Sequence, residues 1–541
     1  MQTRGNRWGL RRSRPVFVLF VLITFAAVFN AGAETQDSTD QQAAQAPAAG
    51  QMPPPAGPPG PPGAPGGPGP FGGGPPPVHY EMLRQNDDFS YLKDPARRTD
   101  LFDPIKYIPF GGKDNWYLSI GGEVRQWWER YDNEDWGGVP DDSNGYLLQR
   151  YMFHADVHFG ERVRTFVQFK SGIVSGRAAG PRLVDKDKLD VNQAFVDLNF
   201  GLKPSGEKPA FTLRLGRQEM HYGTGRLVSA REGPNVRNSF DGVLARINKS
   251  NWQVDFFATK PVQTNFGFFD DSTEHAQTFW GAYGVRTLDP RPSIAQTKLD
   301  VYYLGFRRKV GIFNQGLGPE TRHTVGARIS DQPPMGMVVE GWDYDFEGAF
   351  QFGEFGPYLT FGPAGPTPGG KGNIRAWTIS TDTGYTFNRV KLQPRLGLNT
   401  GVTSGDKDPT DPDLQTFFTP SPNGHYFGHI QQNGPLNIQG FRPNVVLHFP
   451  RLVSVTFDCF FFWRQSLHDG FYNVPGFPLR PSGVSKARYI GTQPQVEVFW
   501  VVNPHVMVDV GYAHFVPGGF LRDSPPSQNL RYALAMVQFR F

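Results

Sequence analysis

The chain has 541 residues, of which 38% are hydrophobic and 14% aromatic, and its formal net charge is +4. Beyond the N-terminal region no apolar run approaches the roughly 20 residues of a spanning helix, which excludes a helical membrane protein. Such a high aromatic content is unusual beside a mean hydropathy of −0.44. A transmembrane β-barrel explains both values, because its strands place alternate residues in lipid and in a polar lumen.

The first 33 residues have the pattern of a secretory signal peptide. Five arginines precede the apolar core 16–29, and Ala31-Gly32-Ala33 follows as a small-residue cleavage site. Because the core is short for a membrane span, we expect cleavage rather than an uncleaved helix. Cleavage removes five arginines and no acids, so 49 basic and 50 acidic residues remain. The basic balance therefore belongs to the signal, and nucleic acid is not an expected partner.

The next two segments precede the barrel. Residues 34–77 are Gln/Ala-rich and then almost entirely Pro and Gly, which predicts a disordered, partly polyproline linker. This linker could meet a partner in the periplasm. Residues 78–115 have mixed polarity and are expected to form a short lead-in. The single cysteine, Cys459, excludes an intramolecular disulfide and a CxxC metal or redox site.

From residue 116 onward apolar and polar residues alternate. In 146–159, Tyr151 and Phe153 face one way, whereas Arg150 and His154 face the other. A period of two residues is typical of strands with one apolar and one polar face. The same pattern recurs at 342–352 and 453–465. The predicted fold is therefore all-β, an antiparallel transmembrane barrel that spans residues 116–541.

Eighteen segments fit this pattern, and bacterial outer-membrane barrels have an even number of strands. The predicted strands are 116–131, 146–159, 161–171, 191–200, 211–219, 240–248, 251–260, 278–287, 297–306, 321–330, 341–352, 372–387, 389–403, 437–449, 452–465, 485–501, 504–516 and 529–541. Tight turns alternate with long loops such as 172–190, 404–436 and 466–484. Short periplasmic turns and long external loops are typical of the outer membrane, which is the expected location.

The loop between the fifth and sixth strands is the first candidate for a functional site. It carries Arg226, Arg231 and Arg237 but only one acid, Glu232. We expect it to fold into the lumen and narrow the pore, where guanidinium groups would bind carboxylates or phosphates. In the alternative interpretation it stays outside, and its arginines bind lipopolysaccharide or remain in water.

The sequence also contains residues for two further kinds of site. The acidic loop 404–413 offers oxygen ligands for Ca²⁺ but lacks the length and closing Glu of an EF-hand, so a solvated loop competes with a calcium site. Its candidate ligands are Asp406, Asp408, Asp411 and Asp413. No other cofactor is expected. The residue types of a hydrolase occur at His154, His158, Ser380 and Asp382, but there is no nucleophile elbow and no HExxH, so no enzyme is expected.

Several long strings resemble the alginate-export family of outer-membrane proteins over about residues 100–541. They are GRQEMHYGTGRLVSAREGPNVRNSFDG from residue 216, SGDKDP from 404, FFWRQSLHDGFY from 461, ARYIGTQPQVEVFW from 487 and GYAHFVPGGFL from 511. The strings resemble the large uncharacterised branch of that family, and the final Phe541 is similar to the C-terminal signal of such barrels.

The resemblance implies an 18-stranded barrel with an arginine-rich pore, which passes an anionic uronate polymer in the characterised member. The pore residues it implies here are Arg217, Arg226, Arg231, Arg237 and Arg464, with Glu219 and Glu232 as ion-pair partners. Two functions follow. The first is a porin for anionic sugars or acidic oligo- and polysaccharides. The second is a plugged structural or binding barrel that acts through its external loops or its linker.

Overall fold

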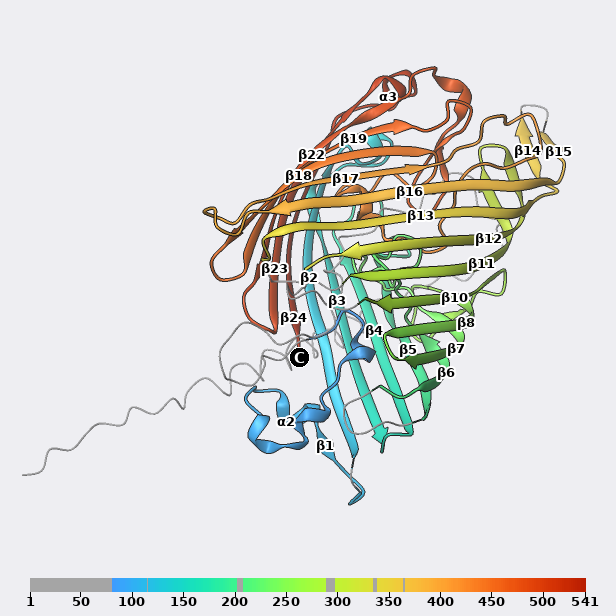
Figure 1. Cartoon of the computed structure of the whole chain (residues 1–541). Coiled ribbons are helices and arrows are strands. Elements are labelled where there is room, and N and C mark those ends of the chain that lie inside the picture. Colours follow the sequence, from blue (N-terminus) through green and yellow to red (C-terminus); the bar gives the residue numbers. More distant parts are fainter. Residues whose placement is uncertain (1–79, 114, 202–207, 289–296, 334–337, 363–364) are drawn as a thin grey trace, which may run out of the picture. The chain divides into compact units, whose positions relative to one another are not determined.

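The computed structural model describes residues 80–541 except 114, 202–207, 289–296, 334–337 and 363–364. The signal peptide predicted at 1–33 and the linker predicted at 34–77 lie outside the described residues. Eighteen antiparallel strands form a closed barrel (Figure 1). They are β2 (Trp116–Asp132), β3 (Asp142–Phe159), β4 (Val163–Ser175), β5 (Asp187–Phe200), β6 (Phe211–Gln218), β7 (Phe240–Lys249), β8 (Trp252–Gln263), β10 (Gln277–Thr287), β11 (Lys298–Phe313), β12 (Gly316–Asp331), β13 (Gly341–Phe355), β16 (Gly372–Thr386), β17 (Arg395–Thr403), β18 (Ile438–Phe449), β19 (Val453–Arg464), β22 (Tyr489–Val501), β23 (Val506–Pro517) and β24 (Leu530–Arg540).

Each wall strand pairs with the next one along the chain, and the last closes on the first. β24 pairs with β2 in a register that places Arg540 opposite Glu123 and Arg531 opposite Asp132. The closure leaves no unpaired edge, which is the condition for β-structure in a bilayer. All eighteen predicted strands are present, so the predicted fold class is confirmed.

The predicted strand boundaries differ most from the structure at two places. A loop was expected at 307–320, but β11 and β12 extend through it and leave only a two-residue turn. Three consecutive basic residues from Arg307 break the alternation there, and a bulge between Arg308 and Gly311 absorbs the irregularity. β17 begins at Arg395 rather than 389, because the chain before it turns through left-handed backbone at Leu392 and Gln393.

Shorter elements lie outside the wall. The lead-in contains three 3₁₀ helices, one short α-helix and one short strand: Arg84–Asn86, Ser90–Lys93, Pro95–Arg97, α2 (Asp103–Lys106) and β1 (Ile108–Pro109). The loops contain β9 (Ser272–Thr273), β14 (Leu359–Gly362), β15 (Gly365–Pro368), β20 (Phe471–Tyr472), β21 (Pro478–Arg480), α3 (Gly519–Asp523) and the 3₁₀ helices Glu134–Gly137, Gly424–Phe427 and Ser482–Val484. No helix among the described residues is long and apolar enough to cross a membrane.

Long and short connections lie at opposite ends of the barrel. α3, within one of the long loops, is at one end, and α2, the lead-in and the C-terminus are toward the other (Figure 1). Long loops at the α3 end include 219–239, 404–437 and 465–488, whereas 160–162, 450–452 and 502–505 are short turns at the α2 end. By the usual asymmetry of outer-membrane barrels, the α3 end is external and the α2 end is periplasmic.

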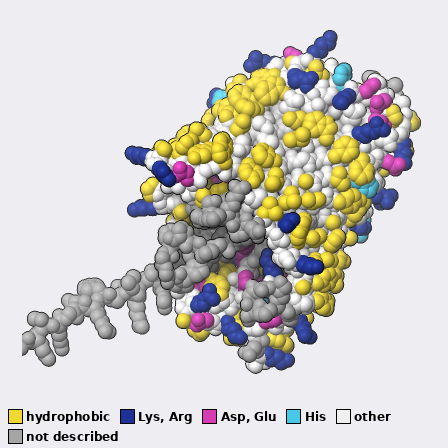
Figure 2. Space-filling view, in the orientation of Figure 1, with side chains coloured by type: hydrophobic (Ala, Val, Ile, Leu, Met, Phe, Trp, Pro, Cys, Tyr) yellow, Lys and Arg dark blue, Asp and Glu magenta, His cyan; other side chains and the backbone are white. Residues whose placement is uncertain are grey.

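The wall alternates between apolar residues that face outward and polar residues that face the lumen. On β13, Phe350 and Phe352 are 46% and 41% exposed, whereas Glu347 and Gln351 are buried. Hydrophobic side chains spread over the broad outer face in Figure 2, with Lys and Arg gathered toward its margins. This distribution suits a wall that meets lipid across its middle and headgroups at its rims.

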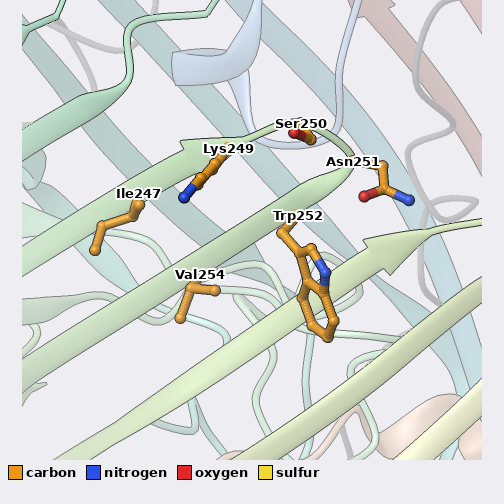
Figure 3. Close-up of a pocket in the computed structure, with 6 residues that line it drawn as sticks. All are labelled: Ile247, Lys249, Ser250, Asn251, Trp252 and Val254. Carbon is orange, nitrogen blue, oxygen red and sulfur yellow. The ribbon is translucent and has the colours of Figure 1, made fainter.

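The turn from β7 to β8 shows how the periplasmic connections are built. Ser250 adopts left-handed backbone at φ 53°, which lets Lys249 pair directly with Trp252. The side chains of Ile247, Trp252 and Val254 lie beside this turn and line a shallow pocket (Figure 3). Ile247 is 41% exposed, so this pocket belongs to the outer wall and not to the lumen.

Candidate pore constriction

Residues 219–239, which we call the lumen loop, lie inside the barrel. One end of the loop is held by the wall of β2 and β3. Arg125 donates to the carbonyl oxygens of Glu232 and Pro234, each at 2.9 Å, and Arg150 donates to the same Glu232 carbonyl at 2.6 Å. Asn235 extends this attachment by donating to Gln149 of β3 and Ile173 of β4. The loop backbone therefore replaces solvent as the partner of buried wall arginines.

Glutamates of the lumen loop complete an ion-pair network with these arginines. Glu232 accepts from Arg150 at 2.6 Å and from Arg237, and Glu219 accepts from Arg237 at 2.6 and 2.9 Å. Arg540 of β24 lies 3.3 Å from Glu232. Burial alone would raise the pKa of Glu232, but Arg150 and Arg237 hold that pKa below its ordinary value. The carboxylate is thus charged and neutralises arginines from both loop and wall.

The other end of the lumen loop reaches a different part of the wall. Arg226 donates to Ser380 at 2.9 Å and to Thr378, both on β16, and lies 3.7 Å from Glu347 of β13. Around the barrel in one direction, the strands from β4 to β13 lie between β3 and β16. In the other direction, the strands from β17 to β24, followed by β2, lie between them. The loop therefore crosses the lumen between opposed walls.

Arg231 differs from the other arginines of the lumen loop. Among the described residues no acidic side chain lies within ion-pair distance of its guanidinium, and its side chain is only partly buried. Its backbone is left-handed at φ 55°, with the backbone N–H donating to the Ser229 hydroxyl at 2.9 Å. Desolvation by burial lowers the pKa of Arg231, but arginine remains a cation at neutral pH. It is the loop cation that is least neutralised by the protein itself.

A second loop, residues 404–437, packs against the lumen loop. Ser421 forms a parallel bridge with Val228, and its carbonyl accepts from the N–H of Ser229 at 2.9 Å. The N–H of Asn423 donates to the carbonyl of Gly225 at 2.9 Å. We call this segment the second lumen loop. The two loops therefore brace each other inside the barrel.

The lead-in segment, residues 80–113 together with 115, enters the same space from the periplasmic end. Arg84 donates to the carbonyl oxygens of Gly122 and Phe541, each at 3.0 Å. Gln85 donates to the carbonyl of Glu219 at 3.3 Å, and the carbonyl of Met82 accepts from Arg237 at 3.1 Å. The lead-in therefore touches the lumen loop, although the two segments are far apart in the sequence.

The comparison with known families decides the identity of this barrel. A family profile described as "Alginate export" matches residues 116–534, most of the chain. The chain belongs to the alginate export family. It is accordingly an outer-membrane β-barrel channel, and the expected family and location are confirmed. Alginate export and porin-like barrel families are transport proteins rather than enzymes. The comparison with curated proteins finds no match.

This alginate export family member is also similar to several solved structures at low sequence identity. The chain is 11% identical to Pseudomonas aeruginosa OccK3 (OpdO), with a TM-score of 0.48, covering 79% of this chain and 96% of that one. Acinetobacter baumannii OccAB1 is 11% identical at a TM-score of 0.48, with 78% and 97% covered. P. aeruginosa OccK2 (OpdF), solved with glucuronate, is 11% identical at a TM-score of 0.45, with 78% and 96% covered.

Two other predicted pore residues of this family member contact protein groups. Arg217 on β6 pairs with Asp241 of β7 at 2.8 Å and is part of the wall. Arg464, at the end of β19, is buried and donates to the carbonyl oxygens of Ser485 and Ala487 at 2.8 and 2.7 Å. Arg464 therefore stabilises the loop that follows β19 rather than the region around Arg231.

The four candidate calcium ligands all accept hydrogen bonds from the protein; Asp411 accepts from the N–H of Asp413 at 2.8 Å. Asp406 is buried, and its backbone N–H donates to Asp469 at 2.8 Å; burial and Asp469 raise the pKa of Asp406 to about 7. Asp408 accepts from Thr410, and Asp413 accepts from the N–H of Asn373. Among the described residues, the groups with ligand atoms close enough to share an ion do not include these four carboxylates.

The hydrolase-type residues do not form a catalytic set. Ser380 accepts from Arg226 in the constriction, whereas His158 pairs with Asp156 at 3.1 Å and stacks on Tyr117. His154 is buried against Phe166. Each of these contacts is a wall or packing interaction, and none places a histidine beside the Ser380 hydroxyl within the described part of the chain.

Proposed function

We propose that this protein is a passive outer-membrane channel for anionic solutes, with uronates and acidic oligosaccharides as the substrate class. The observation that carries the proposal is the position of Arg231. It lies on a loop that crosses the lumen, and its guanidinium has no acidic partner among the described residues. A cation held in this way attracts anions and provides two parallel donors for a carboxylate.

The network around Arg231 supports the same selectivity. Glu219 and Glu232 are engaged by Arg237 and Arg150, so they do not offer free negative charge to the pore. Alginate, named in the family description, is a uronate polymer and carries one carboxylate on each sugar. A constriction with neutralised acids and an available arginine suits this chemistry.

Planar-bilayer recording of the refolded protein tests the proposal. We expect anion-selective current in a KCl gradient, blocked by glucuronate or short oligouronates. Arg231→Gln should shift the reversal potential toward zero and weaken the block. Arg389→Gln is the matched control, because this arginine is 88% exposed in the turn before β17 and pairs with Glu340. Current that is indifferent to both uronates and Arg231→Gln would contradict the proposal.

The packing of the lead-in favours a second candidate function, a barrel closed at rest. Arg84 and Gln85 hold the lead-in against the wall and the lumen loop. A plugged barrel would act through its external loops or its linker. Absence of current in the intact chain, with current restored when residues 80–106 are deleted, would support this second function over the open channel.

A further inference from the structure

A cluster of metal-ligand type lies where the second lumen loop meets β22. His425 and His429 come from the loop and Glu497 from the strand, and their potential ligand atoms all lie within 4.8 Å of one another. Two imidazoles and one carboxylate form a donor set typical of Zn²⁺. At Zn–ligand distances of about 2.0–2.2 Å, ligand atoms in a tetrahedral site are roughly 3.4 Å apart, so small side-chain rotations would close this set.

The histidines of this cluster lack the hydrogen bonds that buried imidazoles normally make. His429 is fully buried, yet neither of its ring nitrogens has a hydrogen-bond partner among the described residues, and the same holds for Nδ1 of His425. A buried polar group without a partner is costly, so such nitrogens point to a missing ligand.

The backbone around the cluster brings the loop unusually close to the wall. Gly511 lies opposite Glu497 in the β22–β23 ladder, and a Cβ at that glycine would be 3.4 Å from Nε2 of His429. At Gly428 a Cβ would meet the amide of Gln493 at 2.3 Å, and the backbone is left-handed at φ 88°. The N–H of His429 donates to Gln495 at 3.0 Å. Two glycines and two glutamine side chains thus fix the histidines against the strand.

The charges around the cluster also favour a cation. Among the described residues no basic side chain lies within ion-pair distance of Glu497 or of Asp509, a buried carboxylate on the neighbouring strand. Arg442 lies near the cluster but forms ion pairs with Asp382 at 3.4 Å and with Asp458 at 3.7 Å. A divalent ion would give these carboxylates the cationic partner that the described residues do not supply.

We propose that His425, His429 and Glu497 bind one Zn²⁺ ion, with a fourth coordination position open, and that this ion fastens the second lumen loop to β22. The second lumen loop braces the lumen loop through Ser421 and Val228, so the ion would stiffen both segments of the constriction. Zinc here is structural, and the proposal stands whichever solute passes through the channel.

Equilibrium dialysis of the full chain, refolded in detergent without a polyhistidine tag, tests the site. We expect one tightly bound Zn²⁺ per chain by atomic spectroscopy. Glu497→Gln and His429→Gln should weaken this binding by more than about tenfold. His275→Gln is the matched control, because this histidine lies in the loop between β8 and β10 and contacts Lys260. Asp187→Asn, in a second acidic cluster, should also leave zinc binding unchanged.

Co²⁺ provides a measurement that depends on no variant. The wild-type protein should show the visible absorption of tetrahedral Co²⁺, and Zn²⁺ should displace it. Wild-type protein that binds no Zn²⁺ would overturn the proposal, since ordered water would then satisfy the rings. Zinc binding that is equal in the wild type and in folded Glu497→Gln would overturn it too.

Discussion

The guanidinium of Arg237 donates to the carbonyl oxygen of Met82 at 3.1 Å. This hydrogen bond joins the lumen loop, which comes from the external end of the barrel, to the lead-in, which comes from the periplasmic end. Arg237 also pairs with Glu219 and Glu232, so the lead-in is tied to the same network that holds the loop across the lumen. Any change that releases the lead-in should therefore alter the conductance of the pore.

The first prediction concerns the attachment of the lead-in. Arg84 donates to Gly122 and Phe541 at the closure of the barrel, so Arg84→Ala should loosen the segment and raise single-channel conductance severalfold. Arg97→Ala is the control, because Arg97 lies on the same segment but rests on the ring of Tyr91. Bilayer recording compares the two variants. Equal conductance in Arg84→Ala and the wild type would show that the lead-in does not obstruct the pore.

The second prediction concerns pH. Burial, with Arg84 nearby, lowers the pKa of Lys106 to about 6, and Nζ donates to the carbonyl of Ile120 at 2.8 Å. Between pH 6 and the ordinary lysine pKa of about 10.4, the released segment binds more protons than the docked one, so docking strengthens as pH rises. Limited proteolysis of 80–106 should slow from pH 6 to pH 9. In Lys106→Met this trend should disappear, and an unchanged trend would assign it to another group.

The alternation of apolar and polar residues was sufficient to predict the wall. It identified every wall strand because outward positions are mostly apolar and many inward positions are polar, as at Phe350 and Gln351. Other inward positions carry buried aromatic residues, such as Phe166 and Phe279. It failed where charge interrupted it, at the three basic residues of β11, and where left-handed backbone delayed the start of β17. The local alternation of apolar and polar residues is thus enough to predict the strands. Predicting where a strand bulges or begins late also requires knowledge of the neighbouring strand.

The site was less predictable, because its partners are far apart in sequence. The resemblance implied Glu219 and Glu232 as ion-pair partners, but the sequence did not reveal that both would engage Arg237. Nor did it reveal that no acidic side chain among the described residues would pair with Arg231. Arg150 and Arg540, on strands far from the loop along the chain, share the Glu232 carboxylate with Arg237. No periodicity links His429 to Glu497 either, so the metal cluster required the folded barrel.

The third prediction concerns the network itself. Glu232→Gln removes the carboxylate that Arg150, Arg237 and Arg540 share, and leaves buried positive charge. Loss of one partner from a buried ion pair costs about 3–5 kcal/mol. Urea unfolding should detect this loss. Glu354→Gln, in an exposed pair with Lys371, should cost about 0–1 kcal/mol. Similar losses in the two variants would mean that the lumen loop is not held by its charges.

The fourth prediction concerns the lipid-facing wall. Phe350 lies near the middle of β13, 46% exposed between Val325 and Trp377, whereas Trp342 lies near the periplasmic end of the same strand. An arginine at the bilayer midplane costs about 2–4 kcal/mol, falling to about 0–1 near the interface. Phe350→Arg should therefore destabilise the barrel more than Trp342→Arg does. Urea titration of folding into lipid vesicles measures the free energy of unfolding of each variant. Because both variants add one arginine, a difference between them reflects the depth of the residue in the bilayer. Equal costs would place the lipid band elsewhere on β13.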